Sequence, residues 1–226
     1  MNTERRRAAL ALLLLVPVPS LAVLTAMQWW PGPPGRVVYF LGKAWILALP
    51  VLWLTLVDRE PIGSSRPTRG GFGLGLALGA LSATVIVATA WILRDRIDIG
   101  LLRVAVERMG LLEPSRFLIA GLGWTLVNSL LEEYVWRWFV TSRWVRLVPP
   151  AAAIVLAAAC FTLHHIVATS FYLPPALVAL ASTGVFVGGA VWSWLWWRTG
   201  SIWPAWLAHI LADAAIFGVG FWLLFR

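Results

Sequence analysis

Seven long apolar segments make up most of this 226-residue chain and leave little room for a water-soluble fold. They fall at about residues 8–28, 37–57, 71–93, 117–140, 151–170, 175–197 and 202–225. A helix needs roughly 20 apolar residues to cross the hydrocarbon core of a bilayer. Charged residues are only 12% of the chain, whereas a soluble domain is about a quarter charged. The sequence therefore predicts an all-α, polytopic membrane helix bundle of about seven transmembrane helices.

Residues 94–116 differ from these segments because charged and apolar side chains alternate along them. This pattern predicts one amphipathic interfacial helix that lies on the membrane surface, or a helix that lines the mouth of a cavity. Small residues show a second pattern, since Gly71, Gly75 and Gly79 recur every four residues, as do Gly184 and Gly188. Such spacing allows the backbones of two membrane helices to approach closely.

The net charge of +8 comes from 17 Arg and one Lys against ten acids. In a soluble protein this balance favours nucleic-acid binding, but here the cations lie mostly in loops, where they set topology and contact lipid headgroups. We therefore expect the lipid bilayer as a partner and no nucleic acid. Arg5–Arg7, Arg143 and Arg198 would lie on one side, which predicts a cytoplasmic N-terminus. The preference for Arg over Lys favours a bacterial inner membrane.

The ionisable residues that lie inside the apolar segments point to a functional site. They are Glu132, Glu133, Arg137 and Asp213, together with all three histidines of the chain, His164, His165 and His209. A charge at the bilayer centre costs about 2.5–3.5 kcal/mol on insertion scales, so such residues are functional candidates by default. Lys43 lies near a segment end, where its side chain can extend toward the surface.

Glu133 and Arg137 have the i, i+4 spacing of an ion pair on one helix face. Glu132 is rotated by about 100° from Glu133, so we expect it to point elsewhere without a partner. A carboxylate in such a place is suited to act as a general base. The alternative is that both acids pair with Arg137 and serve only helix packing.

The histidines supply the other polar groups of the predicted site. His164 and His165 diverge by about 100° on a helix, so we expect only one of them to face the site. His209 and Asp213 share a face, and Asp213 can accept a hydrogen bond from one ring nitrogen and fix the tautomer. The alternative is a purely structural hydrogen bond. We expect Glu132, one of the paired histidines and His209 to converge.

These residues resemble the CPBP family of intramembrane endopeptidases, which includes the CAAX prenyl endopeptidases. The three family motifs occur in order, as Glu132-Glu133-x-x-x-Arg137, Phe161-x-x-x-His165 and His209-x-x-x-Asp213. Asp213 departs from the more frequent Asn of the last motif. The resemblance implies that residues 117–226 form a catalytic four-helix core, preceded by transmembrane helices and the amphipathic segment in residues 1–116.

The resemblance also implies an activity, a glutamate-type hydrolysis of a peptide bond in a membrane-associated protein or peptide. Glu132 and His165 would activate a water, and His209, oriented by Asp213, would stabilise the oxyanion. The supporting residues would be Glu133, Arg137, His164 and Phe161. We expect no cofactor and no metal, because Arg137 beside the acids disfavours a divalent cation. Zinc is the alternative, since three His and three acids could hold it.

Two other function classes stay open at this point. A member of the family without catalytic activity could act as a membrane binding or immunity scaffold. A proton-coupled transporter is the other, because chains of Glu, His and Asp serve as proton relays. The expected partner of an endopeptidase is a membrane-anchored or C-terminal-helix substrate.

Overall fold

The computed structural model describes residues 3–60 and 71–226, and every regular element within them is a helix. Six helices in this part of the chain are long and apolar enough to cross a membrane. They are Thr3–Trp29, Pro33–Asp58, Gly71–Arg96, Pro150–Ser170, Pro175–Thr199 and Trp203–Phe225. The predicted all-α membrane bundle is confirmed. The predicted segment at residues 117–140 is also helical, but it carries Glu132, Glu133 and Arg137 and is not among the six, so the count of seven stays a prediction.

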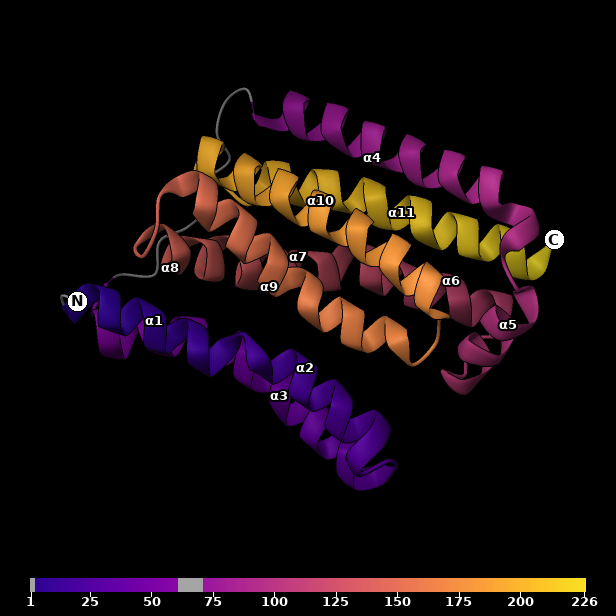
Figure 1. Ribbon diagram of the computed structural model, residues 1–226, viewed down its shortest axis with the longest axis horizontal. Helices are drawn as coiled ribbons and strands as arrows, with labels where there is room; N and C mark the ends of the chain where they lie inside the picture. The colour runs from indigo at the N-terminus through magenta and orange to yellow at the C-terminus, as the bar shows by residue number, and fades with distance from the viewer. Residues whose placement is uncertain (1–2, 61–70) are drawn as a thin grey trace.

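The first two predicted segments form a helical hairpin. Its first arm consists of α1 (Thr3–Leu15), α2 (Pro17–Leu24) and η1 (Thr25–Trp29), and its second arm of α3 (Pro33–Leu52) and η2 (Trp53–Asp58). Gly32 has φ +99° at the tip, a conformation that L side chains rarely adopt. The hairpin lies against the other helices at its N-terminal end and diverges from them toward its tip (Figure 1). The sequence also predicts a polar loop from Asp58 to Gly70, with Pro61, Gly63 and Pro67, but residues 61–70 lie outside the described part of the chain.

The glycine repeat in α4 (Gly71–Leu93) meets α11 (Trp203–Phe225). A Cβ atom at Gly75 would collide with the carbonyl of Pro204, and one at Gly79 would lie 2.8 Å from Cα of Ala208. The predicted close approach is therefore confirmed for this helix.

The corresponding prediction for α10 (Pro175–Thr199) is wrong. Gly184 has nothing within 4 Å of its Cβ position, and the nearest neighbour of Gly188 is Trp192 of the same helix. Gly189 makes the close approach instead, because its Cβ position lies 3.0 Å from the ring of Phe161 in α9 (Pro150–Ser170).

The predicted amphipathic helix over residues 94–116 is shorter than expected. A turn of 3-10 helix, η3 (Arg94–Arg96), precedes α5 (Ile99–Arg108), and Gly110 with φ +72° ends the helical stretch. Asp98 caps α5 by accepting a hydrogen bond from the backbone N–H of Leu101. Helical structure then resumes after Glu113, where a hydrogen bond from the Ser115 hydroxyl, with two from backbone N–H groups, lowers the pKa of the Glu113 carboxyl.

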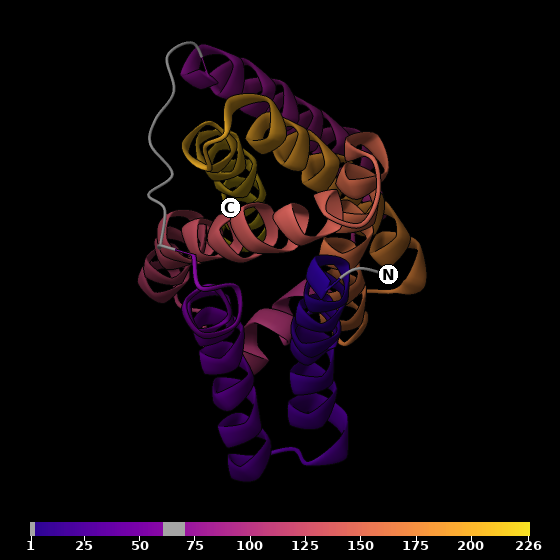
Figure 2. The same ribbon diagram turned by 90° about the vertical axis from the view of Figure 1, so that its left-hand side faces the viewer.

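The segment that carries the first motif is one continuous helical run over residues 114–145. It comprises α6 (Pro114–Leu122), η4 (Gly123–Asn128), α7 (Ser129–Glu132), η5 (Glu133–Thr141) and α8 (Ser142–Val145). The η4 and η5 stretches have π-helical hydrogen bonding, which occurs frequently at functional sites. The run contacts α3, α9, α10 and α11. It therefore lies between the hairpin on one side and α4 and α11 on the other (Figure 2), and its most buried part is η5.

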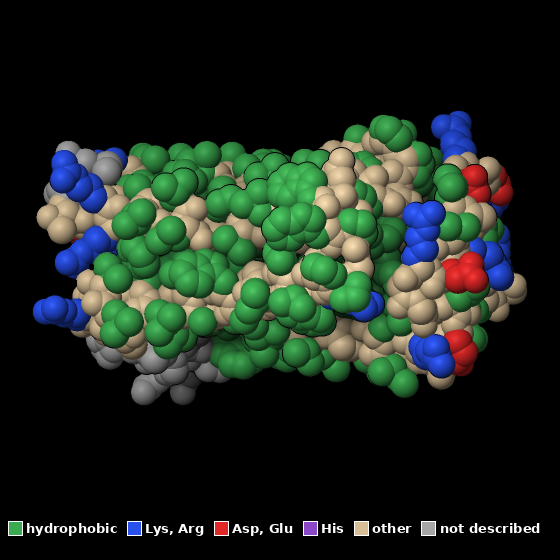
Figure 3. Space-filling view, turned by 90° about the horizontal axis from the view of Figure 1, so that it is seen from below, with side chains coloured by type: hydrophobic (Ala, Val, Ile, Leu, Met, Phe, Trp, Pro, Cys, Tyr) green, Lys and Arg blue, Asp and Glu red, His purple; other side chains and the backbone are tan. Residues whose placement is uncertain are grey.

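Side chains on the outer surface differ in type between the middle and the two ends of the bundle. Apolar side chains cover the middle of the face in Figure 3, and Lys and Arg gather at the two ends. This distribution is expected of a bundle whose middle faces lipid and whose ends face headgroups and water.

Candidate active site

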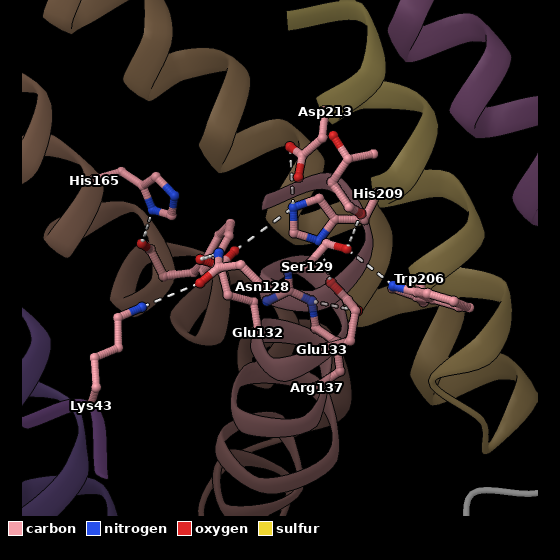
Figure 4. A network of polar contacts seen from close by, with 12 residues as sticks. Lys43, Asn128, Ser129, Glu132, Glu133, Arg137, His165, Trp206, His209 and Asp213 are labelled. Carbon is pink, nitrogen blue, oxygen red and sulfur yellow. Dashed lines mark hydrogen bonds and ion pairs between the residues drawn. The ribbon is translucent and has the colours of Figure 1, made fainter. Parts of the chain in front are cut away.

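The polar residues of the three motifs meet where the run over residues 114–145 passes α9 and α11. Figure 4 shows Glu132, Glu133, His165, His209 and Asp213 gathered there from three helical segments. Ser129 helps to hold this arrangement, because its hydroxyl accepts a hydrogen bond from the indole N–H of Trp206 in α11 at 3.0 Å. The site is thus built from segments that are far apart in the sequence.

Glu133 connects two of the motifs. Its side chain is fully buried, and one carboxylate oxygen lies 3.3 Å from Nε of Arg137, as the spacing predicted. The guanidinium of Arg137 is also fully buried, with its carbon 4.5 Å from the ring centre of Phe161 and 5.3 Å from that of Trp192. The other oxygen of Glu133 accepts a hydrogen bond of 2.9 Å from Nδ1 of His209. Glu133 therefore neutralises Arg137 and orients His209 at once.

This geometry corrects the predicted role of Asp213. The partner that fixes the orientation of His209 is Glu133, because it reaches Nδ1 at hydrogen-bond distance from the neighbouring helix. Asp213 does share a face with His209, but its Oδ1 lies 3.6 Å from Nε2, too far for a direct hydrogen bond. Oε2 of Glu132 lies 3.8 Å from the same nitrogen. Nε2 therefore lies on the side of the ring that faces Glu132 and Asp213, whose side chains are less buried than that of Glu133.

The expectation that Glu132 has no partner is also wrong. Its Oε1 accepts a hydrogen bond of 2.8 Å from the amide nitrogen of Asn128, one turn earlier on the same run. The amide oxygen of Asn128 accepts one of 3.3 Å from Nζ of Lys43. Lys43 lies in the middle of α3 and points to this amide, so it does not extend to the surface as expected. The i, i+4 spacing of Asn128 and Glu132 is visible in the sequence, and it is the signal that could have predicted this partner.

Both adjacent histidines lie beside Glu132, contrary to the expectation that only one would. One ligand atom from each of Glu132, His164 and His165 lies within 4.8 Å of the others. Nδ1 of His165 donates a hydrogen bond to the Phe161 carbonyl at 3.0 Å, and its Nε2 has no hydrogen bond to the residues that the structure describes. The ring of His164 stacks on Trp136 at 5.1 Å, and its Nδ1 is buried without a hydrogen-bond partner among the described residues. The ring centres of His164 and His165 are 4.0 Å apart, so the two side chains pack against each other and do not lie on opposite faces of α9.

A cavity of about 190 Å³ lies between the hairpin and the helical run and reaches these residues. Glu132, Lys43, Asn128, His164 and His165 supply its polar wall. The remaining lining is mostly apolar and comes from α2, α3, η4, η5 and α9, with Ile46, Leu47 and Val135 among its residues. The cavity is large enough for several waters, and one of its walls comes from the N-terminal part of the chain.

The donor set formed by Glu132, His164 and His165 fits a divalent cation such as zinc. Two imidazoles and a carboxylate are three of the four ligands of a catalytic zinc site, with the fourth position open to water. Arg137, which was expected to repel a cation, pairs with Glu133 and not with Glu132. Lys43 remains as a positive charge on the wall of the same cavity.

Residues 114–215 match the family described as type II CAAX prenyl endopeptidase Rce1-like. Comparisons with curated proteins and with solved structures find no match. The matched residues extend from the start of α6 into α11 and contain all three motifs, whereas the hairpin with Lys43 lies before them. The resemblance of the sequence to the CAAX-protease-like intramembrane endopeptidases is therefore confirmed over residues 114–215, the part of this membrane protein that carries the site.

Proposed function

We propose that the protein is an intramembrane endopeptidase that hydrolyses a peptide bond with a water activated by Glu132. The observation that carries this proposal is the position of Glu132, which lines a cavity inside an apolar bundle together with His165 and has Oε2 3.8 Å from Nε2 of His209. A partly buried carboxylate next to imidazoles is suited to act as a general base. The match to a family of endopeptidases supports this chemistry over that of a transporter.

In this mechanism Glu132 takes a proton from a water in the cavity, and Nε2 of His165 helps to hold that water. The water then attacks the carbonyl carbon of the substrate. Glu132 next passes the proton to the leaving amine. Because the nucleophile is water and not a side chain, no covalent bond forms between the enzyme and the substrate. No hydroxyl or thiol nucleophile is needed.

His209 would stabilise the oxyanion that develops during attack. A carboxylate can only accept hydrogen bonds, so Nδ1 carries the proton that is donated to Glu133. Nε2 can therefore donate to the oxyanion only in the imidazolium form of His209. One such donor is worth roughly 3–4 kcal/mol. Asp213, 3.6 Å from Nε2, would stabilise the imidazolium, and Glu133, Arg137, His164 and Phe161 would hold the catalytic groups in place.

We propose that the reaction needs no metal. If a divalent cation such as zinc binds, Glu132, His164 and His165 would hold it, and it would supply Lewis-acid polarisation. In that case Glu133 would still orient His209 through Nδ1. Elemental analysis of the purified protein separates the two possibilities.

The substrate we propose is a membrane-anchored protein or one with a C-terminal helix, processed in a bacterial inner membrane. The richness in Arg favours a bacterial source, where a prenylated CAAX substrate of the kind in the family description is not expected. A cytoplasmic N-terminus is part of the same proposal, and reporter fusions at both termini would test it. The division into residues 1–116 and a catalytic core over residues 117–226 stays a prediction.

Mass spectrometry of membrane-protein termini tests the proposed function. Cells without the gene should be compared with cells that carry the wild type or Glu132→Gln at equal protein levels. New C-termini should appear only with the wild type. If Glu132→Gln restores the same termini, Glu132 is not the general base and the proposed mechanism is wrong. If no termini differ while the wild type and Glu132→Gln both restore a phenotype, the endopeptidase is excluded in favour of a scaffold. Proton flux into proteoliposomes would identify a transporter.

A further inference from the structure

We propose that Asn128 and Lys43 position the Glu132 carboxylate for catalysis, so that the N-terminal hairpin completes the active site. This inference rests on the proposed function of Glu132 as the general base. Neither residue belongs to the three motifs, and Lys43 lies outside the matched residues 114–215.

The three side chains form a chain of hydrogen bonds with only one possible direction. The ammonium of Lys43 can only donate and an ionised carboxylate can only accept, whereas an amide does both. The oxygen of Asn128 must therefore face Lys43 at 3.3 Å, and its nitrogen must face Glu132 at 2.8 Å. If the amide were flipped, its NH₂ group would face the ammonium of Lys43 and its oxygen would face the carboxylate of Glu132, so neither contact could be a hydrogen bond. Lys43 therefore fixes the orientation of Asn128 and, through it, that of Glu132.

The position of the contact on Glu132 matters for the reaction. Asn128 holds Oε1, and the other oxygen, Oε2, faces Nε2 of His209 at 3.8 Å. The hydrogen bond from Asn128 therefore restrains rotation of the carboxylate and keeps Oε2 directed toward the groups that take part in the reaction. The side chain of Glu132 is 16% exposed, so a hydrogen bond to its charge is only weakly screened by water.

Lys43 has few other interactions that could explain its place in the bundle. No carboxylate lies within ion-pair distance of it among the residues that the structure describes, and its one ring contact is with Tyr39, at 5.9 Å. Cations at such depth are expensive and mark functional sites. A purely structural role would not require the ammonium to face the partner of the general base.

Two further contacts fix α3 relative to the helical run. The hydroxyl of Tyr134, next to Glu133, donates a hydrogen bond of 3.0 Å to the carbonyl of Leu47, one turn from Lys43. At the end of the same arm, Asp58 forms a buried ion pair with Arg143 and lies 3.5 Å from Arg146. Lys43 is therefore held in register with Asn128 by contacts on its C-terminal side.

Steady-state kinetics in proteoliposomes test the inference, with a quenched peptide copied from a cleavage site found by the terminal mass spectrometry. Asn128→Leu and Lys43→Met should each lower kcat about tenfold or more, as expected for the loss of a charge-assisted hydrogen bond, with KM changed less than about twofold. Lys43→Arg, which keeps the donor, should retain most of the activity. Arg36→Met removes a cation from an exposed position of α3 and serves as the matched control.

The double variant gives the sharpest outcome. If Lys43 acts through Asn128, Asn128→Leu combined with Lys43→Met should be no slower than Asn128→Leu alone. Effects that multiply, or a rise of KM in Lys43→Met with kcat unchanged, would overturn the inference and assign Lys43 to substrate binding. Glu132→Gln in the same assay separates the two proposals, because full activity there contradicts the proposed function itself.

Infrared spectroscopy gives a measurement that needs no substrate. The difference between the wild type and Glu132→Gln identifies the carboxylate band of Glu132. Asn128→Leu and Lys43→Met should both shift this band, and Arg36→Met should leave it in place. An unshifted band in Asn128→Leu and Lys43→Met contradicts the inference, whatever the activity of these variants.

Discussion

Glu133→Ala should destabilise the protein far more than Glu132→Gln. Glu133 and Arg137 have side chains with no exposed surface, and they lie 3.3 Å apart. Removing one partner of a buried ion pair costs about 3–5 kcal/mol, because the other charge stays buried and unpaired. His209 would also lose the acceptor for its Nδ1 proton. A loss of this size is a large share of the roughly 5–15 kcal/mol that holds a folded domain together.

Glu132→Gln is expected to cost less than about 1 kcal/mol. Its side chain lines the cavity, and the amide oxygen of Gln can still accept the hydrogen bond from Asn128. Unfolding in detergent, followed by tryptophan fluorescence, should therefore show a much lower midpoint for Glu133→Ala and a nearly unchanged one for Glu132→Gln. Activity should be lost in both.

A paired substitution separates stability from catalysis. Glu133→Leu combined with Arg137→Met removes both charges, and replacing a buried ion pair by apolar residues is often neutral or stabilising. This double variant should regain most of the stability that Glu133→Ala loses, but it should stay inactive because His209 is no longer oriented. Wild-type stability of Glu133→Ala, or destabilisation by Glu132→Gln alone, would refute this division between the two acids.

Three other outcomes are expected. Asp213→Asn should lower kcat less than about tenfold, roughly 1.4 kcal/mol, because an amide can still face Nε2, while Asp213→Ala should be clearly slower; equal loss in both would show that the carboxylate itself is essential. Activity should survive exhaustive chelation, and elemental analysis should find no stoichiometric zinc, whereas zinc that is lost in His164→Ala together with activity would establish a metal site. Gly79→Val should destabilise the protein by about 1–3 kcal/mol, because its Cβ would lie 2.8 Å from α11, while Gly73→Ala, which has open space around it, should be neutral in the same unfolding assay.

The membrane bundle could be predicted from the sequence because apolar length alone decides whether a helix can span a bilayer. The Glu133–Arg137 pair could also be predicted, since both residues lie on one helix and its geometry is fixed. The glycine spacing in α4 correctly predicted a close approach to another helix, which the structure shows to be α11, but the same pattern in α10 gave a wrong prediction. There the closest contact involves Gly189, because the rotation of a helix toward its neighbour depends on packing that a short repeat does not encode.

Contacts between different helices account for the errors at the site. The partner of His209 was predicted within its own helix as Asp213, but Glu133 reaches Nδ1 from the run over residues 114–145. Lys43 was missed as a site residue because nothing in local spacing relates α3 to Asn128, 85 positions later. Helix periodicity predicts which residues share a face, but only the tertiary arrangement decides which faces meet.

The rate at which Glu132→Gln cleaves a peptide tests the central claim most directly. The wild type and the variant should be reconstituted at equal amounts in proteoliposomes, with the quenched peptide as substrate and matching unfolding midpoints as the control for folding. The account predicts cleavage by the wild type and a rate for Glu132→Gln that is lower by at least about a thousandfold. Cleavage by a folded Glu132→Gln at a rate close to that of the wild type would contradict it.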